Sequence, residues 1–436
     1  MKRVLSIVLL IAAVLTLSGC NMLTVDKMYC LPERSEEDRK LQVAIDQAMT
    51  DLEYCAPLTG EYQQSVQSAD IDGDEEMEYL VFTKGISDRN LRILLFKEIN
   101  DSFELLDTIE NTGSAFVQVE YAQIDGSGGV EIVVGHQLSD QVIRSVSVYK
   151  YTDKHVVQLL TVSCTKFLTL DMESDGKNEL FVIRPGRADS DNGVAELYTV
   201  TNGKMERFNE ASMSCPADKL KRIVVGKTQD MRIAIYAASA VSEIALITDV
   251  YTLMDGVLVN VSLSKESGTS VGTLRNYYLY AEDIDEDGVV ELPDMNTVVP
   301  LPGTSETQRY EVIRWYSISS DGKETNKVYS YHNFSDSWYL SLDESWARYF
   351  TVDRSSGLDE LYIWNSDYTE ARKVVTIARF TSSEQATEQG YTVLLQTETV
   401  VFAAKLDAAA ETIGLTQDKL IRSFHQIHQQ WKTGEI

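Results

Sequence analysis

The chain has 436 residues and a formal net charge of −28, because 67 acidic residues outnumber 39 lysines and arginines. A surface this acidic repels nucleic acid and anionic lipid, and no stretch of the sequence forms a basic patch, so the composition argues against a nucleic-acid-binding role. The length exceeds that of one small domain and predicts two or three structural units.

The N-terminus has the composition of an export signal. Lys2 and Arg3 precede an apolar run over residues 4–17, which is too short for a comfortable membrane span. The sequence Leu17-Ser18-Gly19-Cys20 resembles the lipobox of bacterial lipoproteins. This resemblance implies that residues 1–19 are a signal peptide, that Cys20 is acylated, and that the protein is lipid-anchored at the extracytoplasmic face of the cell membrane. A plain secretory signal and a short anchor helix are the alternatives.

Residues 20–62 are predicted to form a lipidated tether followed by one helix. Ser35 is a capping residue with acidic residues in the turn after it, and apolar residues then recur at helical spacing as far as Leu52. Two disulfides are conceivable outside the cytoplasm, Cys30 with Cys55 and Cys164 with Cys215. Unpaired thiols are the alternative, because spacing alone does not determine connectivity.

From residue 63 the pattern changes to short β-strands. In each unit a short strand precedes a loop, an apolar strand follows it, and a turn leads to two more strands. The predicted strands of the first three units are 64–69, 78–83, 91–97 and 103–110; 115–122, 131–136, 143–151 and 155–162; and 166–170, 179–184, 194–200 and 203–208. Those of the fourth are near 221–226, 231–237, 244–253 and 257–263, and a fifth unit covers about 271–333.

One acidic loop of nine residues recurs in these units. Its fullest copy, Asp70-Ile71-Asp72-Gly73-Asp74-Glu75-Glu76-Met77-Glu78, has acidic side chains at positions 1, 3, 5 and 9. Alternating carboxylates on a tight loop supply the oxygens that Ca²⁺ prefers. The predicted metal ligands are Asp70, Asp72, Asp74 and Glu78; Asp171, Glu173, Asp175 and Glu179; and Asp283, Asp285, Asp287 and Glu291. Acidic turns that hold no ion are the alternative.

Two further copies of the loop are weaker. One has Gln123, Asp125, Ser127 and Glu131 at the four positions, so that only two acids remain. The copy in the fourth unit has decayed to a turn over residues 227–232 that lacks the alternating carboxylates. We expect the first of these to bind calcium weakly or not at all.

The spacing of the loops predicts the architecture. Position 1 falls at residues 70, 123, 171 and 283, in steps of 53, 48 and 112 residues, the last being twice 56. A repeat of about 50 residues with four strands is typical of a β-propeller blade, which needs neighbours to cover both its faces. We therefore predict a mainly β protein with a propeller of about five four-stranded blades over residues 63–335, five to seven being compatible. A β-sandwich with coincidental acidic turns is the alternative.

The loop at Asp70, which leads directly into an apolar strand, resembles the FG-GAP/VCBS-type repeats of extracellular β-propellers over about residues 65–333. The resemblance implies structural calcium sites between the first and second strands of a blade. It also implies that the backbone carbonyl at position 7 is a ligand, which here belongs to Glu76, Lys177 or Val289. Two features depart from the family pattern. Glu75 replaces the glycine that Gly176 and Gly288 keep at position 6, and the Phe-Gly/Gly-Ala-Pro signature is not visible.

Residues 336–436 have a different pattern. Strands are predicted at 359–364, 372–380, 391–396 and 398–405. Thr416 can then cap a helix whose apolar stripe runs from Leu420 to Trp431. This order predicts a small C-terminal α+β domain, and the alternative is that residues 338–405 add one or two further blades.

The sequence contains no recognisable catalytic constellation, since neither Gly-x-Ser-x-Gly nor His-Glu-x-x-His occurs. Aromatic residues crowd the stretch 277–346, where they could bind a carbohydrate or protein ligand, although core filling is the simpler explanation. The predicted function is therefore a calcium-stabilised propeller that binds a ligand or partner at the cell envelope and is not an enzyme. A polysaccharide-acting enzyme on a propeller scaffold and a structural envelope scaffold are the alternatives.

Overall fold

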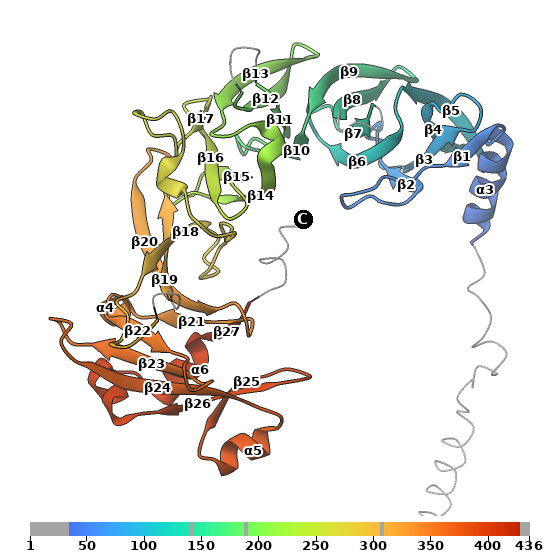
Figure 1. The fold of residues 1–436 in the computed structure, drawn as a ribbon. Coiled ribbons are helices and arrows are strands. Elements are labelled where there is room, and N and C mark those ends of the chain that lie inside the picture. Colours follow the sequence, from blue (N-terminus) through green and yellow to red (C-terminus); the bar gives the residue numbers. More distant parts are fainter. Residues whose placement is uncertain (1–34, 139–143, 187–190, 306–308, 428–436) are drawn as a thin grey trace, which may run out of the picture.

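The computed structural model describes residues 35–138, 144–186, 191–305 and 309–427. The predicted signal peptide, Cys20 and Cys30 lie outside the described residues. The described part is mainly β and contains six antiparallel sheets of four or five strands (Figure 1). No helix in these ranges is long and apolar enough to cross a membrane.

The predicted N-terminal helix is α3 (Glu36–Ala48), and its cap is a capping box in which Ser35 and Asp38 bond to each other's backbone N–H groups. Leu41 and Ile45 are its buried residues and pack on the first sheet. The helix is shorter than expected, because Leu52 begins strand β1 (Leu52–Tyr54), which pairs with the first sheet.

Four sheets follow the predicted four-strand succession. The first has β2 (Val66–Ala69), β3 (Glu78–Gly85), β4 (Leu91–Ile99) and β5 (Ser102–Asn111), and the second has β6 (Ala115–Ala122), β7 (Glu131–Gln137), β8 (Arg144–Thr152) and β9 (His155–Cys164). The third has β10 (Lys166–Leu170), β11 (Glu179–Arg184), β12 (Val194–Thr201) and β13 (Lys204–Ser212), and the fourth has β14 (Leu220–Lys227), β15 (Ile233–Ala240), β16 (Leu246–Met254) and β17 (Val257–Asn260). Each of these strands begins within two residues of its predicted start.

The last two sheets differ more from expectation. The fifth has β18 (Glu291–Thr297), β19 (Glu311–Ile318), β20 (Glu324–Asn333), β21 (Trp338–Leu342) and β27 (Phe424–Gln426). The sixth has β22 (Phe350–Asp353), β23 (Asp359–Trp364), β24 (Ala371–Phe380), β25 (Thr392–Gln396) and β26 (Val401–Leu406), in the order β22-β23-β24-β26-β25. Short helices accompany them: α4 (Glu344–Ala347), α5 (Ser383–Glu388) and α6 (Gln417–Ser423). The described part of the chain also contains the 3-10 turns η1 (Ala217–Lys219), η2 (Val271–Thr273) and η3 (Ala408–Ile413).

One sequence prediction about the C-terminal part needs correction. The domain boundary at residue 335 stays a prediction, and β21 beyond it pairs with β20 through Trp338 and Leu340. The last helix was expected to reach Trp431, yet it ends at Ser423, because the next residues extend as β27 and pair with β21. Residues 350–406 add one more sheet to the series, which was the alternative reading of this segment. Trp431 lies outside the described residues.

The six sheets follow one another in chain order along an arc (Figure 1). Neighbouring sheets share hydrophobic clusters, as when Phe82 of β3 meets Phe116 of β6 and Phe181 of β11 meets Tyr251 of β16. Within the described ranges, no such cluster joins the first sheet to the sixth. The arc ends in helices instead: α3 covers Val81 on the outer face of the first sheet, and α5 covers the sixth through Ala386. Terminal capping of this kind is what a stacked repeat requires for solubility.

Candidate metal centres

The four acidic loops of the sequence share one backbone conformation. Positions 4 and 6 have positive φ in every copy, namely Gly73 and Glu75, Gly126 and Gly128, Ser174 and Gly176, and Glu286 and Gly288. Glu75 therefore adopts the left-handed conformation without being glycine, at a cost of about 1–2 kcal/mol. The departure from the family pattern at this position changes the residue but keeps the left-handed backbone conformation.

The carboxylates of positions 1 and 9 hold this shape. Asp283 accepts hydrogen bonds from the N–H groups of Asp287 (2.9 Å) and Gly288 (2.8 Å), and Asp171 accepts the equivalent pair at 3.1 and 2.9 Å. The glutamate at position 9 accepts from the N–H of position 2 in all four loops, at 2.8–3.1 Å; the acceptors are Glu78, Glu131, Glu179 and Glu291. Each loop is thus closed by its own acidic side chains.

Successive loops are also joined to one another. The N–H of position 8 donates to the carbonyl of position 1 in the preceding loop: Val130 to Asp70 at 3.2 Å, and Asn178 to Gln123 at 2.7 Å. The decayed fourth loop keeps the same connection, since the N–H of Val290 donates to the carbonyl of Lys227 at 3.0 Å. The first three loops are therefore joined to one another, and the fourth is joined to the fifth.

The glutamates at position 9 are buried acids. Glu78 and Glu291 are 0% exposed, and Glu131 and Glu179 are 1% and 4% exposed. Burial, together with the other acids of each loop, raises the pKa of Glu179 to about 7 and that of Glu291 to about 8. A cation bound between the acids would favour the charged form of both side chains.

The loop at Asp283 provides the clearest cation-binding geometry. Asp283, Asp285 and Glu291 each bring a carboxylate oxygen within 4.8 Å of the others. Oε1 of Glu291 is buried and has no hydrogen-bond partner in the described part of the chain, although its other oxygen accepts from Ile284. Lys327 pairs with Asp287 at the rim of this loop. An unpartnered buried oxygen inside a carboxylate cluster fits a hard cation that takes oxygen ligands.

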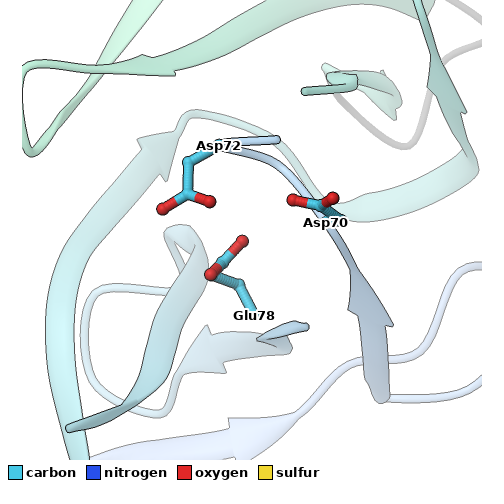
Figure 2. Close-up of side chains that lie close together, drawn as sticks. All are labelled: Asp70, Asp72 and Glu78. Carbon is cyan, nitrogen blue, oxygen red and sulfur yellow. The ribbon is translucent and has the colours of Figure 1, made fainter. Parts of the chain in front are cut away.

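The loop at Asp70 has a similar cluster but contains its own cation. Asp70, Asp72 and Glu78 point toward one another (Figure 2) and lie within the same 4.8 Å limit. The ammonium group of Lys97, on β4, lies 2.7 Å from Asp72, 2.6 Å from Asp74 and 2.7 Å from Glu78. Burial alone would lower the pKa of Lys97, but these carboxylates raise it well above its ordinary value. Lys97 thus already supplies a positive charge to three of the four acidic side chains at positions 1, 3, 5 and 9 of this loop.

The weak loop has the same arrangement. Lys150, on β8, pairs with Asp125 and donates to the hydroxyl of Ser127 at 3.0 Å. Lys97 and Lys150 occupy equivalent positions in their sheets. In the first sheet Tyr79 pairs with Phe96, so the next residues, Glu78 and Lys97, face each other across the strands. In the second sheet Ile132 pairs with Tyr149, so Glu131 and Lys150 face each other in the same way. The loops of the first two sheets, at Asp70 and Gln123, therefore each receive one positive charge from a lysine of the neighbouring strand.

The two later loops lack this lysine. The residue that faces Glu179 across the strand pair is Thr199, and the residue that pairs with Glu291 is Ser317. In the loop at Asp171 the four acids do not converge as tightly, since no three of them lie within 4.8 Å of one another. Its backbone and its position-1 hydrogen bonds nevertheless match those of the loop at Asp283. In the loop at Asp283, Lys327 of β20 pairs with Asp287 and forms no ion pair with Asp283, Asp285 or Glu291. Neither loop therefore has an ammonium group paired with its position-9 glutamate.

Three predicted features of the site have different outcomes. The N–H groups of Glu76, Lys177 and Val289 each donate to the position-5 aspartate at 2.9 Å, while their role as carbonyl ligands stays a prediction.

Cys55, Cys164 and Cys215 are free thiols, so Cys164 and Cys215 do not form a disulfide here. The aromatic stretch is mostly core, as Trp315, Tyr316 and Trp338 are at most 1% exposed, and the simpler explanation holds for them.

No family model and no curated protein matches this chain. Among solved structures, it is similar to the exotype rhamnogalacturonan lyase YesX, with a TM-score of 0.29 and 12% identity over 74% of this chain and 65% of the lyase. It is also similar to a candidate 6-phosphogluconolactonase from Bacteroides uniformis, with a TM-score of 0.30 and 12% identity over 73% of this chain and 86% of that one. The chain thus spans less than two thirds of the lyase, and neither likeness bears on function.

Proposed function

We propose that this protein is a lipid-anchored, extracytoplasmic binding protein built on a calcium-stabilised, propeller-like array of six blades. The observation that carries the proposal is the carboxylate cluster of Asp283, Asp285 and Glu291, with its buried and unpartnered Glu291 oxygen. The ordered succession of sheets, the shared clusters between neighbours and the hydrogen bonds that join loops support the propeller-like part. The export signal and the lipobox ending at Cys20 support the location.

In this proposal the loops divide into two classes. Those at Asp171 and Asp283 take calcium through the side chains at positions 1, 3, 5 and 9. Those at Asp70 and Gln123 are closed by the ammonium groups of Lys97 and Lys150. Calcium supplies positive charge among carboxylates that otherwise repel one another. It would hold β10 and β11 in register at the Asp171 loop, and the bridge between Glu282 and Glu291 at the Asp283 loop. The ions would be structural, and ligand binding takes place elsewhere on the array.

Calcium removal tests the metal part of the proposal. EDTA should lower the melting temperature of the full chain in detergent, and excess calcium should restore it. A ligand that binds only the folded state adds about 2.7 kcal/mol when present at 100 times its dissociation constant. Magnesium should restore less, because it demands a stricter octahedral geometry. Superimposable melting curves with and without EDTA would remove calcium from the account.

Cys20→Ala tests the anchor. Loss of the acylated thiol should move the protein from the membrane fraction to the soluble fraction, since the apolar run of residues 4–17 is short. Cell fractionation followed by immunoblotting measures the distribution. Cys55→Ala, which removes another thiol, should leave the protein in the membrane fraction, and retention of the Cys20→Ala variant there would refute acylation.

A further inference from the structure

A cavity lies away from the acidic loops, between the second, third and fourth sheets. It has a volume of about 720 Å³ and is bordered by β6, β10 and β14, the first strands of three successive sheets, and by residues 58–63. These strands run along the inner side of the arc (Figure 1). The volume falls within the range of small-molecule sites, roughly 300–1,000 Å³.

The residues that line the cavity are mainly basic, whereas the chain as a whole is acidic. Four basic residues line it, Arg144, Lys166, Lys221 and Arg222, against one acid, Glu61. The chain as a whole has 67 acidic and 39 basic residues. The sequence shows no basic patch, because these residues come from the second, third and fourth sheets and meet only in the fold.

Two of the cations, Arg144 and Lys166, form no ion pair among the described residues. Lys166 donates to the neutral side-chain amide oxygen of Gln118 at 3.1 Å. Burial lowers the pKa of Lys166, the nearby carboxylate of Glu120 raises it, and Arg144 lowers it. Arg144 and Lys166 therefore repel each other, and Glu120 offsets part of that repulsion. Arg222 differs from them, since it stacks on Tyr280 and lies 4.0 Å from Glu282.

A polar group of the cavity wall is also unsatisfied. His136 is 3% exposed, and its Nδ1 atom has no hydrogen-bond partner in the ranges that the structure describes. Burial lowers its pKa, and a hydrogen bond to the backbone of Val134 raises it by less. A neutral imidazole has one donor nitrogen and one acceptor nitrogen, so a polar ligand in the cavity could supply the partner that Nδ1 lacks.

We propose that this cavity binds a small organic oxyanion, a carboxylate or a phosphate carried on a polar body. Arg144 offers the planar fork that pairs with two oxygens of such a group, and Lys166 offers a point charge beside it. Binding an anion replaces the repulsion between the two cations with attraction to a common partner. The inference rests on the proposed binding role and is independent of the calcium loops and the lipid anchor.

Calorimetric titration with three sugars that differ at one carbon tests this inference. Glucose, glucuronate and glucose 6-phosphate are titrated into the full chain in detergent, at low ionic strength and with excess calcium. At least one of the two anions should bind saturably and glucose should not, and the better of the two identifies the preferred oxyanion. Added sodium chloride should weaken binding, because the contacts are ionic.

Variants locate the site. Arg144→Gln and Lys166→Gln should each weaken anion binding by about tenfold or more, equivalent to about 1.4 kcal/mol. Both variants should melt at or above the wild-type temperature, because each removes one of two positive charges that repel each other. Lys405→Gln, on the exposed side of β26, should change neither anion binding nor the melting temperature. Equal binding of glucose and the anions, no binding of either anion, or unchanged binding in both variants would each overturn the inference. Calcium-dependent melting of the same samples shows separately whether the metal proposal stands.

Discussion

Replacing Lys97 with methionine should convert the loop at Asp70 from a lysine-closed loop into a calcium site. Without calcium the variant should be less stable than wild type by about 3 kcal/mol, because it leaves three acidic side chains without their cation, including the fully buried Glu78. With calcium, most of that loss should be recovered, since Asp70, Asp72, Asp74 and Glu78 are then free to hold the ion.

Denaturant unfolding in EDTA and in calcium measures the two free energies, and calcium titration counts the ions. The variant should bind one more ion per chain than wild type. Lys405→Met, on an exposed strand position remote from the loops, is the matched control and should alter neither quantity. A Lys97→Met protein that gains no ion and loses no stability would show that the ammonium group does not replace calcium.

Glu291→Gln should lower the free energy of unfolding in calcium, and should leave it unchanged or raise it in EDTA. It removes the charge of a ligand that is 0% exposed, so calcium affinity at this loop should fall about 100-fold, equivalent to about 2.8 kcal/mol. In EDTA the free energy of unfolding should stay the same or rise, because a neutral amide is cheaper to bury than a carboxylate and can still accept from the N–H of Ile284.

The same pair of unfolding curves, in EDTA and in calcium, measures both effects. Glu384→Gln, an exposed acid on α5, controls for the loss of one negative charge and should leave the curves almost unchanged. Equal destabilisation of Glu291→Gln in both conditions would mean that Glu291 is a structural hydrogen-bond acceptor and not a calcium ligand.

Much of the repeat architecture could be read from the sequence because it follows local rules. Alternating apolar residues such as Leu80 and Phe82 mark strands, and the loop spacing marks their succession. Position 9 was identified as acidic, and the structure adds that each such glutamate closes its loop through the N–H of position 2. These features depend on residues close together in the chain.

The features that the sequence missed depend on pairing between distant residues. Lys97 and Lys150 face Glu78 and Glu131 only because of strand register. A signal was present, since both lysines stand three residues before a turn with positive φ, at Asn100 and at Asp153. The pattern became meaningful only when the strands were paired.

The C-terminal segment was misjudged for a related reason. The helical period of residues after Thr416 continues past Ser423, but β21 offers an open edge that Phe424 to Gln426 complete as β27. The sixth sheet also departs from simple succession, because β26 lies between β24 and β25. Tertiary pairing overrides local periodicity in both places.

The most direct test of the account is the position of calcium in crystals of the full chain grown with the ion, located by anomalous scattering. The account predicts ions in the loops that begin at Asp171 and Asp283 and none in those that begin at Asp70 and Gln123. Empty loops at Asp171 and Asp283, or an ion at Asp70 with the Lys97 ammonium still in contact with its three carboxylates, would contradict it.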